Sequence, residues 1–287
     1  MNVGVIFPQT EYGSDPGAIR EFAQVAEDLG FSHILTYEHV LGVDPNRPGW
    51  KGIYGLDDPF LEPFSLLSFW ASITERISFL TGILILPQRQ TVLAAKQAAT
   101  LDVLSGGRLR LGVGIGWNEP EYIALGKNFH DRGRRIEEQI ELMRILWTEP
   151  LVNFSGQWDR VEDSGMNPLP IQQPIPIWFG GHADPAIRRA ARLGDGWLPT
   201  YLSVDDAKPH LAELQEYLDD AGRTSSEFGL EARIHYREGD IERMGGLMQD
   251  WREAGATHIG LNTMRSRLND PSEHMNALRT FAEALLN

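Results

Sequence analysis

The chain has 287 residues, 42% of them hydrophobic and 23% charged, and it contains no cysteine. The absence of cysteine excludes disulfides, thiolate nucleophiles and sulfur-ligated metals, so redox chemistry needs a bound cofactor. The formal net charge of -14 disfavours nucleic-acid binding, and the sequence has no long apolar run and no secretion signal. We therefore expect a cytoplasmic protein that binds neither nucleic acid nor membrane.

Short β-branched and apolar runs alternate along the chain with longer segments of helical period. Eight such units predict a single domain, residues 1–287, folded as an α/β (β/α)8 TIM barrel with long loop insertions. The predicted strands are 3–7, 32–36, 77–86, 109–113, 177–179, 196–199, 229–235 and 257–261.

The first predicted helix, 16–29, has clear signals at both ends. Asp15 precedes it as an N-cap, and Gly30 follows it where a left-handed residue is favoured. Two later segments, 40–62 and 152–176, are too long for simple turns, and loops of this length are usually functional. The first of them follows a strand, so we expect it at the active-site end of the barrel.

Loops after the strands build the active site of such a barrel, so residues just past each strand are candidates. After the second strand, Glu38 and His39 place a carboxylate beside an imidazole that exchanges protons near neutral pH. A histidine that only stabilises its loop is an equal alternative. In the third strand, Thr81, Gly82 and Ile83 predict a bulge or a close approach to a planar ligand, with simple relief of packing as the alternative.

The fourth strand runs into GVGIGWN, residues 112–118, which lacks the last glycine of a dinucleotide-binding fingerprint. We interpret it as a strand whose glycines let a ligand lie on the backbone, with Trp117 and Asn118 at its end. The alternative places Trp117 in the core.

In the fifth unit, Gly180, Gly181 and His182 precede a helix, and their main-chain amides predict a phosphate site. Asp184 is predicted to cap this helix and to compete for the same amides. A tight strand-to-helix turn without a ligand is the alternative.

Weaker candidates are found near other strand ends. Arg89, Arg188 and Arg189 offer positive charge to an anionic cofactor tail, or are solvated surface charges. His235 and Asn262 end the seventh and eighth strands, where they either contact substrate or only pack within the fold. No metal-ligand motif is present, so no metal site is predicted.

Together these segments resemble the luciferase-like monooxygenase superfamily, in particular its bacterial branch of deazaflavin-dependent oxidoreductases. The resemblance runs from VGVIFPQ at Val3 to about Thr200, and the segments LSGGR and GVGIGWN are its most specific parts. It implies a luciferase-like barrel in which the cofactor ring lies over a non-prolyl cis peptide in the third strand, here Gly82–Ile83.

The same resemblance implies site residues and a cofactor. The family's acidic residue and histidine, its fourth-strand contacts and its phosphate loop match Glu38, His39, Trp117, Asn118, Gly180 and Gly181. The cofactor implied first is coenzyme F-420, a deazaflavin; FMN is the alternative because many deazaflavin users have Asp at the position of Glu38. We expect His39 to exchange a proton with substrate while Glu38 holds it and the 40–62 loop closes over both.

Three functions follow from these alternatives. The first is hydride transfer between coenzyme F-420 and a small organic substrate, and the second is an FMN-dependent monooxygenase served by a separate flavin reductase. The third is a non-catalytic flavin-binding protein. The resemblance also implies a homodimer, and Trp50, Tyr54 and Phe60 favour an apolar or aromatic substrate.

Overall fold

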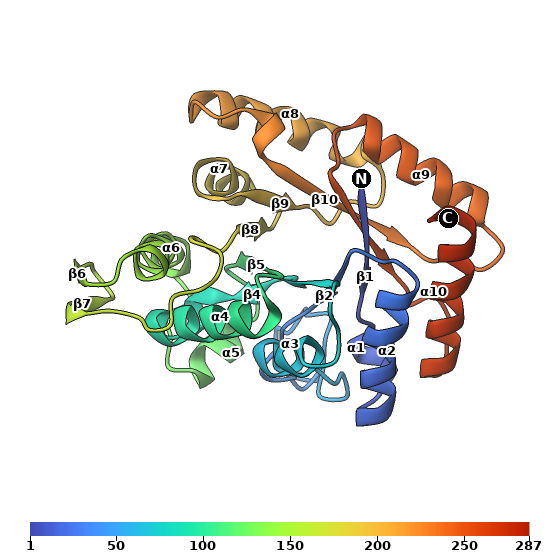
Figure 1. Ribbon diagram of the computed structural model, residues 1–287, viewed down its shortest axis with the longest axis horizontal. Coiled ribbons are helices and arrows are strands. Elements are labelled where there is room, and N and C mark those ends of the chain that lie inside the picture. The colour runs from blue at the N-terminus through green and yellow to red at the C-terminus, as the bar shows by residue number, and fades with distance from the viewer. Residues whose placement is uncertain (287) are drawn as a thin grey trace.

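The computed structural model describes residues 1–286 and shows a closed parallel barrel with helices around it (Figure 1). The barrel strands are β1 (Asn2–Ile6), β2 (His33–Thr36), β3 (Ser78–Thr81), β4 (Leu84–Ile85), β5 (Leu109–Gly114), β8 (Ile177–Gly180), β9 (Gly196–Leu198), β10 (Gly229–His235) and β11 (His258–Asn262). They follow the order β3-β2-β1-β11-β10-β9-β8-β5-β4, and a β3–β5 pairing closes the ring. Because β3 and β4 share the third position, the predicted eight-stranded α/β barrel is confirmed. Asn287, the last residue of the predicted domain, lies outside the described residues.

Helices alternate with these strands and cover the outside of the barrel. They are α1 (Gln9–Tyr12), α2 (Pro16–Asp28), α3 (Pro63–Ala71), α4 (Thr91–Ser105), α5 (Glu119–Ala124), α6 (Arg132–Thr148), α7 (Asp184–Leu193), α8 (Val204–Asp220), α9 (Ile241–Glu253) and α10 (Pro271–Leu285). The predicted ends of the first long helix are confirmed: the Asp15 carboxylate accepts the Ala18 amide at 2.7 Å, and Gly30 has a φ of 84°. Within residues 1–286, no helix has both the length and the apolar character needed to cross a bilayer.

The third strand, predicted as one run over 77–86, is interrupted in the structure. β3 ends at Thr81, β4 begins at Leu84, and the peptide bond between Gly82 and Ile83 is cis. A Cβ added at Gly82 would overlap the Leu35 side chain of β2. Glycine lets the Leu35 side chain pack against the backbone at this point, and it marks the interruption in an otherwise apolar strand.

The barrel interior is filled at the amino ends of its strands. There, Glu231 on β10 lies 2.9 Å from His33 Nε2 on β2 and 3.1 Å from Arg110 Nη1 on β5. A layer of apolar side chains lies above this ionic cluster, formed by Ile6, Leu35, Leu80, Trp178, Leu198 and Met264. Ligands are therefore expected at the carboxyl ends, as in other barrels of this kind.

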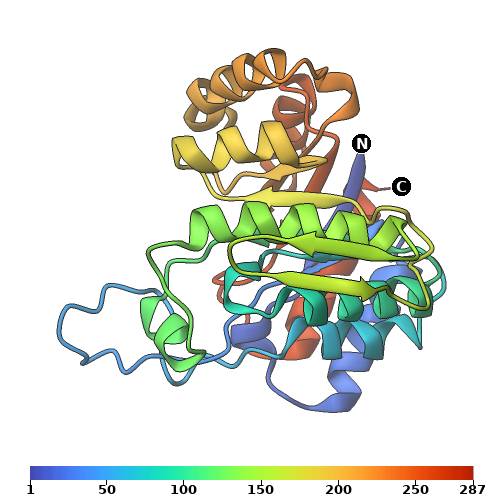
Figure 2. The same cartoon turned by 90° about the vertical axis from the view of Figure 1, so that its left-hand side faces the viewer.

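Two long connections depart from the strand–helix alternation (Figure 2). The 40–62 loop extends away from the barrel at the same end as α5. The segment 152–176, predicted as an irregular loop, contains an antiparallel hairpin formed by β6 (Val152–Ser155) and β7 (Arg160–Ser164). These two strands are short and mostly exposed, so they lack the alternation by which the barrel strands were predicted. A short 3-10 turn, η1 (Leu86–Gln88), follows β4, and another, η2 (Ser225–Glu227), precedes β10.

Candidate active site

His39, the predicted acid or base, is anchored by a buried carboxylate. Its Nδ1 lies 3.2 Å from Oε1 and 3.3 Å from Oε2 of Glu121 on α5. Glu121 is fully buried and also accepts the main-chain amides of Val40 at 2.8 Å and Leu41 at 3.1 Å. Burial would raise the pKa of Glu121, but the hydrogen bonds from His39 and these amides lower it below its usual value. An ionised Glu121 favours the tautomer of His39 that carries its proton on Nδ1.

The prediction that Glu38 holds His39 is wrong. The Glu38 carboxylate accepts the main-chain amide of Ile85 and forms a buried ion pair with Arg89, which also lies 2.8 Å from Glu62. Successive side chains along an extended segment point to opposite sides, so the two neighbours diverge after β2. Glu38 therefore connects the start of the 40–62 loop to β4. Through Arg89 it also connects the start of this loop to Glu62 at the end of the loop, so Arg89 is engaged in ion pairs.

Glu121 was not among the predicted residues. Its helix has only six residues, too few for a periodic pattern, and Glu119 on the same helix is an exposed carboxylate. The two differ only in their surroundings, which are set by the 40–62 loop folding back over α5.

Aromatic rings surround His39. The ring centroids of Tyr54, Phe60 and Trp117 lie 5.1, 5.0 and 5.3 Å from the imidazole centroid. Trp117 is 44% exposed, so the alternative that placed it in the core is wrong, and Trp50 lies 5.5 Å from it. The loop residues proposed to line a substrate pocket thus meet the end of β5 around the histidine.

The Ile83 side chain packs directly against glycines on neighbouring strands. A Cβ added at Gly114 would lie 2.9 Å from Ile83 Cδ1, and one at Gly180 would lie 2.5 Å from Ile83 Cγ2. Gly112 passes so close to β3 that a Cβ would overlap the Thr81 carbonyl oxygen. The Thr81 hydroxyl donates to the Gly112 carbonyl at 2.7 Å and is engaged within the wall. The interrupted third strand, β5 and β8 therefore pack closely together at the carboxyl ends of the strands. We call this surface, formed by Gly82, Ile83, Gly114 and Gly180, the wall beside Ile83.

Asn118 follows Trp117 and provides an acceptor beside this wall. It is 2% exposed, and its Oδ1 is buried without a hydrogen-bond partner in the part of the chain that the structure describes. It precedes α5, yet its side chain makes no capping bond. A buried acceptor left unpaired costs roughly 1–3 kcal/mol, so a ligand donor at this point would be stabilising.

Gly180, Gly181 and His182 connect β8 to α7, where the phosphate site is predicted. Gly181 has a φ of 109°, a conformation that glycine adopts without strain. His182 is exposed, and its Nδ1 lies 3.5 Å from the Thr200 hydroxyl. Tyr201, the next residue, has a buried hydroxyl that lacks a partner among residues 1–286. The β8–α7 loop and the neighbouring Thr200 and Tyr201 thus place polar groups near the amino end of α7.

The predicted cap from Asp184 is wrong. α7 begins at Asp184 itself, and its carboxylate accepts from Arg188 Nε at 3.0 Å and from the Tyr217 hydroxyl at 2.5 Å. Asp184 therefore does not occupy the amides before the helix. Arg189 in turn pairs with Glu137 at 3.0 Å, so both of the predicted arginines of α7 already have carboxylate partners.

His235 and Asn262 lie side by side in register at the ends of β10 and β11. The Asn262 Oδ1 accepts the main-chain amide of Met264 at 2.9 Å, which fixes its side chain. His235 is half-buried, and burial, followed by the charges of nearby arginines, lowers its pKa. His235 is therefore a neutral imidazole at pH 7.

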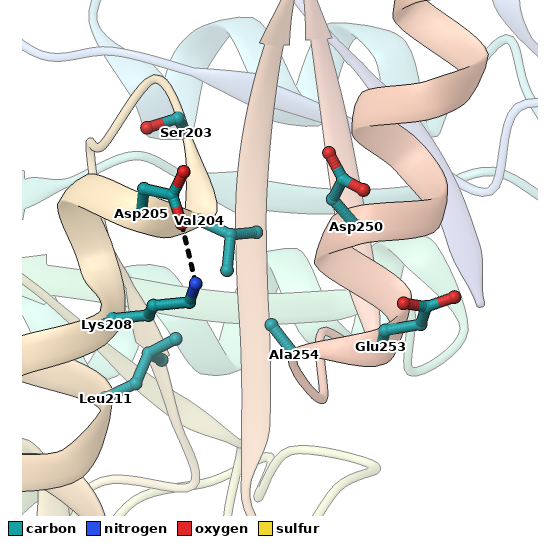
Figure 3. Close-up of a pocket in the computed structure, with 8 residues that line it drawn as sticks. All are labelled: Ser203, Val204, Asp205, Lys208, Leu211, Asp250, Glu253 and Ala254. Atoms are coloured by element: carbon teal, nitrogen blue, oxygen red, sulfur yellow. Dashed lines mark hydrogen bonds and ion pairs between the residues drawn. The ribbon is translucent and has the colours of Figure 1, made fainter.

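A separate hollow of about 520 Å³ lies between α8 and α9 (Figure 3). Polar side chains line much of it, and Lys208 pairs there with Asp205 at 2.6 Å. None of the predicted site residues lines this hollow. It lies in the outer helical layer and takes no part in the candidate site.

The unpaired Asn118 oxygen is an acceptor for a ring N–H, and the β8–α7 loop beside Ile83 offers main-chain amides to a phosphate tail. The fold and this site together define a class: (β/α)8 barrels that hold a flavin-type ring at the carboxyl ends of their strands. The chain belongs to the luciferase-like monooxygenase family, whose sequence profile matches residues 1–281. It is a luciferase-like flavin- or deazaflavin-dependent oxidoreductase.

Relatives of the chain use both kinds of cofactor. An uncharacterised protein of Mycobacterium tuberculosis is 42% identical over 210 residues, which cover 71% of this chain and 72% of that protein. The FMNH(2)-dependent dimethylsulfone monooxygenase of Pseudomonas putida is 32% identical over 68% of this chain and 52% of its own length. The F420-dependent hydroxymycolic acid dehydrogenase of Mycobacterium tuberculosis is 29% identical over 88% of this chain and 68% of its own length.

A solved structure supports the fold. The monooxygenase RslO1 from Streptomyces bottropensis superposes with a TM-score of 0.81 at 22% identity, covering 100% of this chain and 99% of that one.

Proposed function

We propose that the protein uses coenzyme F-420 to transfer hydride to or from a small organic substrate, with His39 exchanging the accompanying proton. The observation that carries this proposal is the Glu121–His39 pair, which presents Nε2 of the imidazole among aromatic rings at the carboxyl ends of the strands. When hydride is added to a carbonyl carbon, the oxygen takes up a proton, and when an alcohol is oxidised, its oxygen loses one. Both directions require a proton donor or acceptor near that oxygen. A histidine with a fixed tautomer provides one.

The cofactor would lie along the wall formed by Gly82, Ile83, Gly114 and Gly180. The Asn118 oxygen would accept a hydrogen bond from the ring, and Gly181 and His182 would hold the phosphate. When bound there, a deazaflavin supplies a hydride donor or acceptor, whereas a reduced flavin reacts with oxygen. The protein contributes position and water exclusion.

The aromatic rings give the substrate side its character. Tyr54, Phe60 and Trp117 border His39 and would exclude water from the proton-transfer step. The 40–62 loop supplies two of these rings, and Glu38 and Arg89 brace that loop at both ends. The loop is therefore the element that we propose to close over the substrate.

An FMN-dependent monooxygenase is the second candidate. It is favoured by the 32% identity to the dimethylsulfone monooxygenase, which exceeds the 29% identity to the F420-dependent dehydrogenase. In this case a separate flavin reductase would be the partner.

The two candidates are separated by parallel assays. We expect the protein and reduced coenzyme F-420 to reduce members of an aldehyde and ketone panel anaerobically, and His39→Asn to slow this about 10²–10⁴-fold. The matched control is His130→Asn, an exposed histidine, which should leave the rate unchanged. Substrate-dependent oxygen uptake with reduced FMN, and none of the deazaflavin reaction, would establish the monooxygenase instead. Cofactor binding without turnover, unchanged in His39→Ala, would favour a non-catalytic binding protein.

We also propose a homodimer, as the family resemblance implies. α4 exposes large apolar side chains, among them Val92 at 46%, Leu93 at 54% and Leu104 at 61%. Such a surface suits a partner subunit. The mass of the native particle in solution tests this proposal.

A further inference from the structure

Arg233 is a basic side chain inside the barrel mouth that the proposed reaction does not use. It lies on β10 two residues after Glu231, so both side chains face the barrel interior. The Arg233 guanidinium carbon is 5.1 Å from the ring centroid of Tyr37, whose ring packs against the apolar interior layer. Arg233 is half-buried. Its guanidinium therefore lies just above the packed interior, where a ligand entering from the carboxyl ends would stop.

Arg233 has no carboxylate partner. Within residues 1–286 none of Arg233, Arg237 and Arg265 has a carboxylate oxygen within 4.0 Å, whereas Glu231 below is engaged by His33 and Arg110. The pKa of His235 is lowered chiefly by burial of the imidazole. The positive charges of the three arginines lower this pKa further. The Glu11 carboxylate accepts the main-chain amide of Arg265.

This group of arginines has the opposite sign to the rest of the chain, whose formal net charge is -14. Guanidinium groups without a carboxylate partner attract anions, and they bind planar oxyanions through two parallel (bidentate) hydrogen bonds. An unpaired, half-buried arginine is therefore a site for an anion, and its planar fork matches a carboxylate.

Tyr54 lies between this group of arginines and His39 in the proposed site. Arg233 packs on Tyr37, and Arg265 is an exposed residue just after β11, the strand next to β10. Both arginines oppose the rise that burial causes in the pKa of Tyr54. The Tyr54 ring in turn lies 5.1 Å from the His39 ring and 4.9 Å from the Phe60 ring. The predicted phosphate loop, in contrast, follows β8 rather than β10. Arg233 packs on Tyr37, two residues before His39, and thus lies on the same side of the mouth as the proposed reaction centre.

We propose that Arg233 and Arg265 bind the carboxylate of the substrate, and that Tyr54 and Phe60 receive its apolar body. The inference rests on the proposed function, because it places this anion beside His39. It narrows the substrate class to organic acids that carry an apolar or aromatic group. The reacting carbon would lie between the carboxylate and His39.

Benzoate and benzamide test this proposal, because the two molecules share shape and differ in charge. We expect wild-type apoprotein to bind benzoate at least tenfold more tightly than benzamide in calorimetric titrations. Arg233→Met should bring the benzoate affinity down to that of benzamide, and Arg265→Met should lower it less. Arg252→Met, which removes an exposed arginine from α9, makes the same change in net charge and should leave benzoate binding unaltered.

Cofactor titrations of the same variants separate the sources of the anion. Unchanged affinity for coenzyme F-420 and FMN in Arg233→Met supports substrate binding, and an equal loss for the cofactor would assign the arginine to the phosphate tail and overturn the proposal. Equal binding of benzoate and benzamide by the wild-type protein would also overturn it. These affinities are measured on the apoprotein, so they stand even where no turnover is detected. Should Arg233→Met not fold, as judged by circular dichroism, Arg265→Met carries the test: unchanged benzoate affinity in that variant would overturn the proposal.

Discussion

The Glu121–His39 pair joins two elements that lie 82 residues apart in the chain. Glu121 is fully buried and accepts two main-chain amides of the 40–62 loop as well as the imidazole. One carboxylate therefore sets both the orientation of His39 and the start of the loop that covers it. The lowered pKa of Glu121 keeps it ionised at neutral pH.

Glu121→Gln keeps the shape of this side chain and removes its charge. We expect nitrogen-detected NMR of the imidazole to show a single tautomer for His39 in the wild type and a mixture in the variant, because an amide no longer demands a donor at Nδ1. Turnover should fall at least about tenfold, since the proton-exchanging nitrogen is no longer defined. Glu119→Gln, an exposed change on the same helix, is the control. A single tautomer in Glu121→Gln would show that the carboxylate does not set it.

The candidate residues on the strand ends could be predicted, and their partners could not. Position after a strand was enough to single out His39, Asn118 and Gly180. The predicted partner of His39 was Glu38, and the observed partner is Glu121. This difference depends on how the 40–62 loop folds over α5, which no local sequence pattern encodes. Arg233 is similar, because its lack of a partner is visible only once β10 is set beside its neighbours.

Among the elements, β3 and β5 approach each other closely in the barrel wall. The Thr81 hydroxyl bonds the Gly112 carbonyl, and the Thr81 carbonyl leaves no space for a side chain at position 112. The wall beside Ile83 depends on this contact. The contact lies at Thr81, the last residue of β3.

Gly112→Ala should destabilise the fold by about 1–3 kcal/mol or more in urea unfolding, because the new methyl group meets backbone atoms that cannot move aside. Gly246→Ala is the matched control: a Cβ there meets no neighbour within 4 Å, and the residue lies inside α9. Helix propensity predicts that this change stabilises by up to about 1 kcal/mol. Equal stability of the two variants would contradict the close packing of β3 on β5.

The strand order was predictable because apolar runs and helical periods alternate along the chain, and the capping residues Asp15 and Gly30 were predictable from local chemistry. The hairpin of β6 and β7 was not, because its exposed strands have no apolar face. The start of α7 was misplaced because Asp184 has a better partner in Arg188 and Tyr217 than in the helix amides.

At the scale of the whole molecule, buried histidines make the stability depend on pH. His274 is fully buried, its Nδ1 lies 2.8 Å from the Thr263 hydroxyl, and burial lowers its pKa to about 4. His258 at the amino end of β11 has a pKa lowered to about 3, chiefly by burial. A histidine whose pKa is lower in the folded state favours folding above its unfolded pKa, near 6.5, and loses that contribution as pH falls toward the folded value.

We therefore expect the free energy of unfolding to fall as pH decreases from about 6.5 to 4, by up to about 1.4 kcal/mol per pH unit for each buried histidine. His274→Gln should flatten this slope in urea unfolding followed at several pH values, whatever its effect at pH 7. His130→Gln removes an exposed histidine and should keep the wild-type slope. An unchanged slope in His274→Gln would show that this imidazole is not held neutral.

We propose that the wall beside Ile83 and the β8–α7 loop hold a deazaflavin. Titration of the apoprotein with coenzyme F-420 and with FMN, followed by fluorescence, tests it most directly. We predict saturable binding of both at one site, with coenzyme F-420 bound at least tenfold more tightly. Tighter binding of FMN, or binding of neither, would contradict the claim.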